Sequence, residues 1–409
     1  MRVLVFNCGS SSLKFELIEL DAGAGRRLKT IGRGTFEGIG GLGRRVLIDS
    51  NGTRSEHAES PHDHAAAALE AIDWLESITS GQPLRADAVA HRIVHGGPDL
   101  AAPAIATASV LDAIEAASVF APLHNPVSLG TLRAVSGRLP HLPCVIVADT
   151  FFHQTIPDYA REYAIPRALA ARHRIRRYGF HGIAHAWMVE RYAELEGKNA
   201  GVNLITLQLG AGCSVAAIRN GQSIDTSMGL TPLEGLMMAT RSGDLDPAIV
   251  SFLSTHENLA ASKVEEILNH NSGLLGVSGI SGDLRAVEAA AKAGNRDAVL
   301  AIEMFCYRIR KYLGAYRAAL GSVDAIVFGG GIGEHAADVR AKICEPLKTI
   351  GLELDPALNV QADGRERRIS ADRSPIKIMV IPVDEEQYIA KAAARLVTAT
   401  HRAGASGAP

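Results

Sequence analysis

Two apolar segments with the composition of β-strands flank a short polar turn near the start of the chain. Residues 3–20 read VLVFNCGSSSLKFELIEL, and the turn holds Asn7, Gly9 and the serines at 10–12. A plain hairpin needs only two or three residues that tolerate positive φ, and it has no use for a run of hydroxyl groups. The segment therefore predicts a β-hairpin whose turn holds something polar, such as a phosphate or a metal ion.

A similar hairpin pattern occurs halfway along the chain. Residues 203–221, NLITLQLGAGCSVAAIRNG, again place an apolar strand, a polar residue (Gln208), a turn of small residues and a second apolar strand in that order. One such hairpin would open each half of the chain, which indicates a duplicated unit. Glycine hairpins are also common in unrelated α/β proteins, so the pattern by itself leaves duplication and coincidence open.

Strand-like and helical segments alternate along the chain, which predicts an α/β fold. At 409 residues the chain exceeds one ordinary core, so two domains are expected. Residues 156–182 are irregular, basic and punctuated by proline, and they place the domain boundary near residue 150. We therefore predict domains at 1–150 and 151–384, a C-terminal helix at 385–400 and a disordered tail at 401–409.

The composition excludes several classes of partner. A formal net charge of -2 gives no electrostatic reason to expect nucleic acid or an anionic membrane. No stretch approaches the roughly 18 uncharged apolar residues of a membrane span, and the N-terminus lacks a cleavable signal. The 5 cysteines are scattered without a Cys-x-x-Cys pair, which is typical of free thiols in a reducing cytosol. The sequence thus predicts a soluble cytoplasmic protein.

Residues 331–336 (GIGEHA) follow an apolar strand and begin a helix. Glycines at a helix N-terminus let an anion approach bare backbone N–H groups. A dinucleotide fingerprint has a similar form, and Glu353 lies at a plausible distance for a ribose, but that fingerprint normally follows the first strand of its domain. The glycines of 38–43 share the spacing without a following helix, and we interpret them as coincidence. The sequence contains no P-loop motif.

Arginines and histidines lie in several glycine-containing loops. Arg92 and Arg241 suit recognition of carboxylate or phosphate, because a guanidinium group donates two parallel hydrogen bonds. Arg176 and Arg177 suit the same role. For each of these four arginines, a surface ion pair is the ordinary alternative. That alternative is weakest for Arg241, whose neighbours are small and polar. For His181 a structural and a functional role are both open.

Two acids stand at the carboxyl ends of buried strands, where α/β sheets build ligand sites. Asp149 ends the strand CVIVAD, and Glu385 lies just beyond IKIMVIP. Mg²⁺ binds through few carboxylates together with waters and phosphates, so this pair would suit it. A helix N-cap is the competing interpretation, since a helix begins at that point. We prefer the cap for Asp384 and leave both interpretations open for Glu385.

Nine motifs in chain order account for nearly all of these features. They are NCGSSSLK (7–14), HRIVHGG (91–97), FAPLHNP (120–126), DTFFHQTIP (149–157), RRYGFHG (176–182), DTSMGLTPLEGLMMATRSGDLDP (225–247), GISGDLR (279–285), GGGIGE (329–334) and IPVDEE (381–386). Together they resemble the acetate kinases of the acetate and sugar kinase/Hsp70/actin superfamily. The resemblance spans residues 3 to about 398.

The resemblance implies a fold and an activity. The fold would be two duplicated RNase-H-like (actin-like ATPase) domains with an active-site cleft between them, and the helix at 385–400 would pack back on the first domain. The activity would be reversible, Mg²⁺-dependent phosphoryl transfer between ATP and acetate by direct in-line transfer, giving acetyl phosphate and ADP. The family also suggests a homodimer. The physiological direction stays open.

The resemblance also assigns residues to roles. It implies catalytic roles for Arg92, Asp149, His181 and Arg241, of which His181 and Arg241 stabilise the transition state and Asp149 orients the metal ion. It implies a substrate site formed by Arg92, Val94, Leu123, His124, Phe180 and Pro232. It implies nucleotide and phosphate contacts by Ser10, Ser12, Lys14, Gln208, Gly210, Gly212, Asp283, Leu284, Arg285, Gly331, Ile332, Gly333 and Glu334. It implies binding of Mg²⁺ or Mn²⁺ by Asn7 and Glu385.

The chemistry agrees with these roles. Phosphoryl transfer asks mainly for alignment and charge stabilisation, and an acceptor carboxylate is already ionised at neutral pH, so no strong general base is needed. Arginine and histidine would offset the repulsion between two anions. Since one extra methylene changes discrimination by only about 1–3 kcal/mol, propionate should be a poorer but real substrate.

The chain departs from the family at two places. The second hairpin usually reads His-Leu-Gly-Asn-Gly, whereas here residues 208–212 read Gln-Leu-Gly-Ala-Gly. Loss of one preorganised hydrogen-bond donor lowers the rate by a factor on the order of 100. Phosphoryl transfer from ATP would therefore be slower, or pyrophosphate would be the phosphoryl donor. Asp384 also replaces a usual Asn near the metal. A kinase that prefers propionate or butyrate and a non-catalytic nucleotide sensor both stay open, and an NAD-dependent enzyme using 331–336 is disfavoured.

Overall fold

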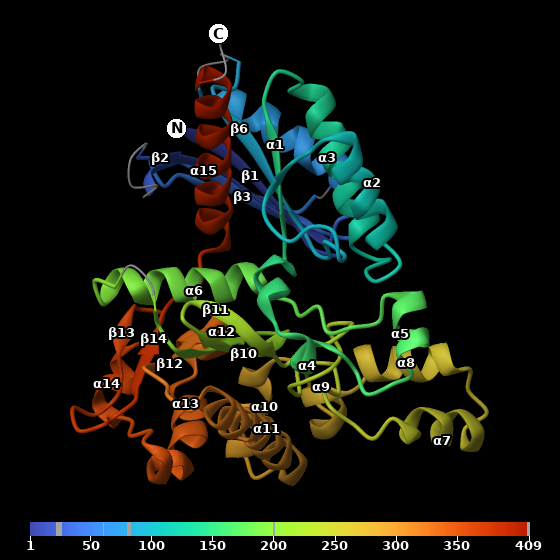
Figure 1. Cartoon of the computed structure of the whole chain (residues 1–409), viewed down its shortest axis with the longest axis vertical. Helices are drawn as coiled ribbons and strands as arrows, with labels where there is room; N and C mark the ends of the chain where they lie inside the picture. The colour runs from blue at the N-terminus through green and yellow to red at the C-terminus, as the bar shows by residue number, and fades with distance from the viewer. Residues whose placement is uncertain (22–26, 60, 80–82, 199–200, 407–409) are drawn as a thin grey trace. The chain divides into compact units, whose positions relative to one another are not determined.

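The computed structural model describes residues 1–21, 27–59, 61–79, 83–198 and 201–406, with side chains described as far as residue 402. The chain forms two compact units (Figure 1). Unit 1 comprises Met1–Phe152 and Asp384–Pro409, and unit 2 comprises His153–Val383. No helix in the described part of the chain is long and apolar enough to cross a membrane.

Unit 1 is built on an eight-stranded sheet with the order β5-β4-β3-β2-β1-β6-β8-β7. Its first three strands are antiparallel, and β6 and β8 run parallel to β1. The strands are β1 Arg2–Cys8, β2 Ser12–Leu20, β3 Arg27–Glu37, β4 Arg44–Asp49, β5 Arg54–His57, β6 Ala88–Ile93, β7 Ala104–Ile105 and β8 Cys144–Ala148.

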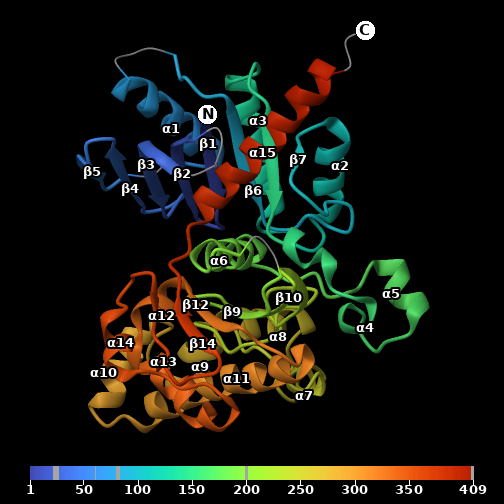
Figure 2. The same ribbon diagram turned by 60° about the vertical axis from the view of Figure 1, so that its left-hand side comes forward.

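Helices cover both faces of the unit 1 sheet (Figure 2). The long helix α15 (Glu385–Ser406) lies along β1, β2, β6 and β8. On the opposite face are α1 (His64–Ile78) and α3 (Asn125–Arg138), with α2 (Ala108–Ala117) beside α3. Because side chains alternate along a strand, Leu4 and Phe6 pack in the core with α1, whereas Asn7 faces α15.

Unit 2 contains a six-stranded sheet with the order β11-β10-β9-β12-β14-β13. Its strands are β9 Leu204–Leu209, β10 Cys213–Arg219, β11 Gln222–Thr226, β12 Ala325–Gly329, β13 Arg367–Arg368 and β14 Lys377–Val380. The helix α6 (Gly182–Leu195) packs on β9, and the long helix α11 (Arg296–Leu320) packs on β10.

Shorter helices complete unit 2. They are η1 Phe151–Thr155, which starts at the end of unit 1, α4 Asp158–Arg161, α5 Arg167–His173, α7 Ala248–His256, α8 Ala261–His270, α9 Gly273–Ser278, α10 Leu284–Lys292, α12 Gly330–His335, α13 Ala337–Cys344, η2 Glu345–Ile350 and α14 Pro356–Gln361.

The two sheets repeat one topology. In each, an antiparallel meander of three strands, which β4 and β5 extend in unit 1, is joined by two parallel strands and a short antiparallel edge strand. The strand β9 thus corresponds to β1, β12 to β6, and β14 to β8. This arrangement confirms the α/β fold of duplicated RNase-H-like units that the paired hairpins and the resemblance predicted.

The C-terminal segment differs from expectation. The helix α15 continues to Ser406, past residue 400, so residues 401–406 are helical where we expected disorder, and 407–409 lie outside the described residues. Asp384 caps this helix as predicted, since its carboxylate accepts from the N–H of Gln387 at 2.9 Å. The same carboxylate pairs with Arg27 at 3.1 Å, which offsets the charge that we expected it to add near the metal.

Candidate active site

Four predicted site residues meet at the strand ends of unit 1. Asn7 and Arg92 are direct partners in the parallel ladder of β1 and β6. Asp149 follows β8, and its N–H donates to the carbonyl of Ile93 at 2.7 Å. Glu385 is the first residue of α15. The sheet therefore brings together side chains that lie up to 378 residues apart in the sequence.

Hydrogen bonds connect these four side chains into one network. The Arg92 guanidinium donates to Asp149 Oδ2 at 3.0 Å and to Asn7 Oδ1 at 3.3 Å. The Asn7 amide nitrogen lies 3.0 Å from a carboxylate oxygen of Glu385 and 3.1 Å from one of Glu386. Both ends of the Asn7 amide thus join the arginine to the acids, and the assignment of Asn7 to the metal ion stays a prediction of the resemblance.

The charged groups of this network shift one another's pKa values. Burial raises the pKa of Glu385, and the neighbouring Asp149 and Glu386 carboxylates raise it further, whereas Arg92 lowers it. Burial alone would lower the pKa of Arg92, but Asp149 and Glu385 raise it above its usual range, so this arginine is a permanent cation. Asp149 and Glu385 therefore share the Arg92 guanidinium, and the Glu386 carboxylate lies beside them on Asn7. A divalent cation would offset this negative charge, and hard oxygen donors of this kind suit Mg²⁺.

The donor set is small for a protein-only metal site. Among the described residues there is no group of three or more His, Cys, Asp and Glu side chains arranged to hold a metal ion. A cation held by Asp149 and Glu385 would complete its coordination with water or phosphate. Mg²⁺ commonly keeps such ligands, because it gives up water reluctantly. The residues present fit that ion.

The remaining predicted residues of unit 1 have varied surroundings. Val94 is buried, whereas Leu123 is 66% exposed. His124 precedes the first residue of α3 and makes no side-chain capping bond. In the first hairpin, Ser10 is exposed and the Gly9 N–H donates to the Ser12 carbonyl at 2.8 Å. Lys14 is exposed and pairs with Asn7 across β1 and β2.

Unit 2 brings His181 and Arg241 together at Gly212 in the second hairpin turn. A Cβ atom added to Gly212 would lie 3.4 Å from His181 Nε2 and 3.5 Å from Arg241 Nη1, so glycine there leaves room for both side chains. His181 has a left-handed backbone (φ 55°) at the start of α6. Arg241 Nη1 also lies 3.4 Å from the carbonyl oxygen of Pro232.

The electrostatic setting of Arg241 differs from that of its neighbours. Burial lowers its pKa, and no acidic side chain in the described part of the chain pairs with it. Arg177, by contrast, pairs with Glu234 at 2.6 Å and donates to three backbone carbonyls. Arg177 is therefore a structural residue, and Arg241 is a partly buried cation suited to an anionic ligand.

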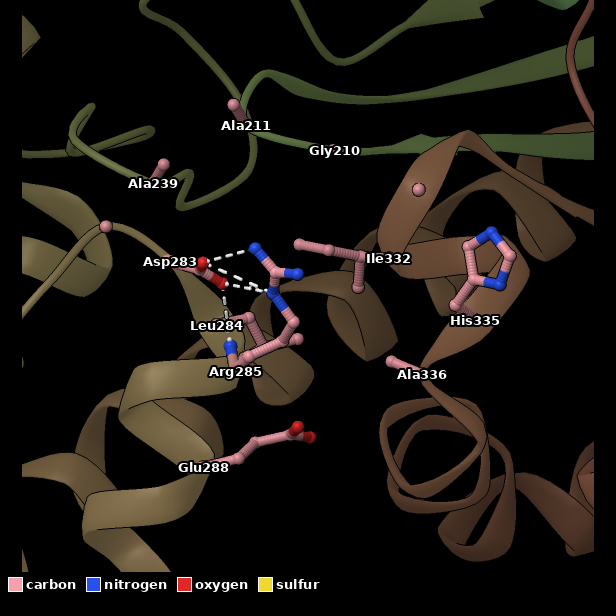
Figure 3. Close-up of a pocket in the computed structure, with 12 residues that line it drawn as sticks. Gly210, Ala211, Ala239, Asp283, Leu284, Arg285, Glu288, Ile332, His335 and Ala336 are labelled. Carbon is pink, nitrogen blue, oxygen red and sulfur yellow. Dashed lines mark hydrogen bonds and ion pairs between the residues drawn. The ribbon is translucent and has the colours of Figure 1, made fainter. Parts of the chain in front are cut away.

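A pocket of about 690 Å³ lies in unit 2 (Figure 3). In Figure 3, Asp283, Arg285 and Glu288 line one side, and Ile332, His335 and Ala336 line the opposite side. Asp283 caps α10 and forms an ion pair with Arg285 at 2.6 Å. The lining residues are Gly210, Ala211, Ala239, Gly282, Asp283, Leu284, Arg285, Glu288, Gly331, Ile332, His335 and Ala336.

Some predicted nucleotide contacts do not line this pocket. Glu334 accepts a hydrogen bond from the N–H of Val383 at 3.0 Å, and the Gly333 carbonyl accepts from the buried Arg340. Gln208 and Gly212 also lie outside its lining, and Ser10, Ser12 and Lys14 belong to unit 1.

Sequence reasoning missed Ala239, Gly282, Glu288, His335 and Ala336. His335 directly follows the GGGIGE motif and could have been found from it. Ala239, Gly282 and Ala336 lie within the quoted motifs 225–247, 279–285 and 331–336, so the motifs indicated their segments without assigning these residues. Glu288 lies outside every quoted motif, and only the fold brings it to the pocket.

These features define a class of protein, the kinases with an actin-like ATPase fold. The crystal structure of an acetate kinase from Porphyromonas gingivalis is similar, with a TM-score of 0.89, 39% identity, and coverage of 97% of this chain and 99% of that one. A propionate kinase from Francisella tularensis superposes with a TM-score of 0.86 and 36% identity, covering 96% of this chain and 98% of that one.

Sequence comparison gives the family. The acetokinase family profile matches residues 2–391. The acetate kinase of Solibacter usitatus is 46% identical over 408 residues, which cover 97% of this chain and 98% of that protein. The acetate kinase of Phocaeicola vulgatus is 45% identical over 395 residues, covering 95% and 98%. The chain therefore belongs to the acetokinase family, phosphotransferases that use a carboxyl group as acceptor.

Proposed function

We propose that this enzyme transfers a phosphoryl group between ATP and acetate, reversibly and by direct in-line displacement. The observation that carries the proposal is Arg241, a partly buried cation without an acidic partner in the described residues, next to His181 across Gly212. Such a pair suits the charge that develops on a phosphoryl group in flight. The relatives named acetate kinase support the choice of substrate.

In unit 1, Arg92 neutralises the acceptor carboxylate, which is already ionised and needs no base. Asp149 and Glu385 would hold Mg²⁺, which supplies neutralisation of phosphate charge when bound. Asn7 keeps both the arginine and Glu385 in orientation through its amide. These residues supply alignment and charge and remove no proton.

In unit 2, we assign the pocket to the nucleotide. Its volume of about 690 Å³ exceeds what pyrophosphate needs, which favours ATP as the donor even though Gln208 and Ala211 replace the usual hairpin residues. Gly331 and Ile332 lie in the first turn of α12 at the pocket wall, and the glycine leaves room for the approach of an anion.

Val94, Leu123, Phe180 and Pro232 would surround the methyl group of acetate. A pocket of this kind discriminates weakly against one methylene, so propionate is a slower substrate.

We also infer that the enzyme is a cytoplasmic homodimer. The 5 cysteines are all free thiols, and exposed apolar side chains such as Tyr159 and Phe252 in unit 2 are suited to a protein interface. Size-exclusion chromatography with light scattering tests the dimer.

The direct test is trapping of acetyl phosphate as the hydroxamate, with acetate, Mg²⁺ and either ATP or pyrophosphate. We expect product with ATP, loss of about 1000-fold in turnover for Arg241→Ala, and full activity for the matched surface variant Arg172→Ala. Product with pyrophosphate alone would make the altered hairpin a donor switch. Nucleotide binding without product from any short carboxylate would identify a sensor and refute the proposal.

A further inference from the structure

A chain of buried side chains leads from the core of unit 2 to the imidazole of His181. The Ser214 hydroxyl lies 2.9 Å from His181 Nδ1 and 2.8 Å from His185 Nε2. The second ring nitrogen of His185, Nδ1, lies 2.7 Å from Thr206 Oγ1. We propose that Thr206, His185 and Ser214 are positioning residues that fix His181 as the neutral tautomer with its proton on Nε2. The inference rests on the proposed function, because that function gives His181 its role at the transferring phosphoryl group.

The direction of the chain follows from its inner end. Thr206 is fully buried, and among the described residues His185 Nδ1 is the one hydrogen-bond partner of its side chain. A buried hydroxyl proton without an acceptor is costly, so Thr206 donates to His185 Nδ1. A neutral imidazole that accepts at Nδ1 carries its proton on Nε2.

The donor and acceptor roles from His185 to His181 follow in the same way. His185 Nε2–H donates to the Ser214 oxygen, which leaves the single Ser214 proton for His181 Nδ1. His181 then accepts at Nδ1 and carries its own proton on Nε2. This is the ring atom that lies 3.4 Å from the Cβ position of Gly212, on the side of the turn that Arg241 also faces.

The surroundings keep His185 neutral. The side chain is fully buried, and burial together with the nearby His153 and His181 lowers its pKa well below the usual value. A neutral His185 cannot donate from both nitrogens. If it accepts a hydrogen bond at Nδ1, it must therefore donate one at Nε2.

A second buried histidine fixes the backbone beside His181. His153 Nε2 lies 3.0 Å from the carbonyl oxygen of Phe180, which can only accept, and His153 Nδ1 lies 2.8 Å from Ser223 Oγ. The ring nitrogen therefore donates to the carbonyl. This bond helps to hold the left-handed conformation of His181, and the Ser214 chain sets the proton position of its ring.

In this proposal His181 acts as a neutral donor, whereas the sequence-based expectation made it a cation. A neutral Nε2–H donor stabilises an equatorial phosphoryl oxygen by hydrogen bonding, and it leaves Arg241 and the metal ion to carry the positive charge. No proton moves along the chain in this proposal, since the hydroxyls and His185 only orient the ring.

The first test is NMR of the ¹⁵N-histidine-labelled enzyme without substrates, in which two-bond correlations report the tautomer of each imidazole. We expect a neutral His181 with its proton on Nε2, and His181→Gln identifies the signal. A His181 that carries its proton on Nδ1, or a protonated imidazolium, at pH 7.5 would overturn the proposal. Because no turnover is involved, this result is independent of whether acetate is the substrate.

The second test separates positioning from simple stability. Thr206→Val removes the hydroxyl at nearly constant volume, whereas Thr206→Ser keeps it. We expect Thr206→Val to lower kcat several-fold with unchanged KM for acetate and ATP and a mixed His181 tautomer, and Thr206→Ser to restore both. Ser214→Ala should lower kcat by about tenfold. Equal losses in Thr206→Val and Thr206→Ser, or a loss without a change of tautomer, would show a merely structural role.

Discussion

The two units share a sheet topology and differ in what stands at matching strand ends. In unit 1, Asn7 pairs with Arg92 across β1 and β6, and in unit 2, Gln208 pairs with Gly329 across β9 and β12. The residue after β8 is Asp149, whose N–H donates to Ile93, the residue after Arg92. The residue after β14 is the apolar Ile381, whose N–H donates to Phe328, the residue before Gly329.

The difference shows how one backbone serves two purposes. Unit 1 places an arginine and an acid at its central strand ends, which suits a metal ion and a carboxylate. Unit 2 has a glycine at the arginine position, and a Cβ there would lie 2.7 Å from Val383 and 2.8 Å from Met188. Side chains are excluded from that strand end, and the pocket is lined instead by loops and helix starts that surround it.

The largest effect is expected at the arginine that unit 2 lacks. Arg92→Ala removes the cation next to Asp149, which is 1% exposed, so unfolding free energy should fall by about 3–5 kcal/mol. Turnover should fall by about 1000-fold. Adding Asp149→Asn should recover much of the stability and none of the activity, as measured by urea unfolding and hydroxamate assay. Arg133→Ala, which breaks the exposed pair with Glu115, is the control and should cost less than about 1 kcal/mol. Similar losses in both would mean that the strand-end pair is not special.

The next effect concerns the glycines of unit 2. Gly330 has φ +74°, and a Cβ on it would lie 2.6 Å from the carbonyl oxygen of Leu209. Gly330→Ala should therefore destabilise the enzyme by about 1–3 kcal/mol. Gly331→Ala has no atom within 4 Å of its new Cβ and should leave the unfolding midpoint unchanged while weakening ATP binding at the pocket wall. Calorimetry and nucleotide titration distinguish the two, and a stable Gly330→Ala protein would contradict the steric argument.

A third prediction concerns a buried residue of unit 1 that differs from its counterpart in unit 2. His91 in β6 corresponds to Phe328 in β12, is 1% exposed and stacks on Phe6. Burial lowers its pKa to about 3. The unfolded chain takes up a proton near pH 6.5 and the folded chain does not, so this histidine costs no stability above pH 6.5 and progressively destabilises the protein as the pH falls towards 3.

Between pH 7 and 5, wild type should thus lose about 2 kcal/mol on account of His91. His91→Phe, which copies unit 2, should lack that component. Urea unfolding at the two pH values provides the measurement. Parallel pH profiles for wild type and variant would show that His91 does not titrate as described.

The smallest effect concerns the second hairpin. Ala211 lines the pocket and has no side-chain hydrogen-bonding group. Ala211→Asn adds a donor at the turn, and kcat/KM for ATP should rise by about tenfold while KM for acetate stays constant. Ala211→Val adds bulk without a donor and should give no gain. If the asparagine also brings no gain, this turn does not limit use of the donor.

Local patterns in the sequence were sufficient for the elements that depend on neighbours. The two hairpins, the glycine-rich start of α12 and the cap at Asp384 all follow from residues within a few positions of one another. Motif order was likewise sufficient to indicate the fold and the family. Those predictions succeed because turn geometry, strand alternation and capping are short-range properties.

Tertiary structure decided the features that join distant segments. The helix α15 follows β14 of unit 2 in the chain but belongs to unit 1 and packs on β1, and α6 comes after β8 of unit 1 but belongs to unit 2 and packs on β9. The Asn7 bridge between Arg92 and Glu385, the pocket walls and the chain from Thr206 to His181 depend on the same folding. No local preference encodes which buried hydroxyl will face which imidazole. Only packing, which forces each buried donor to find an acceptor, sets the proton position on His181.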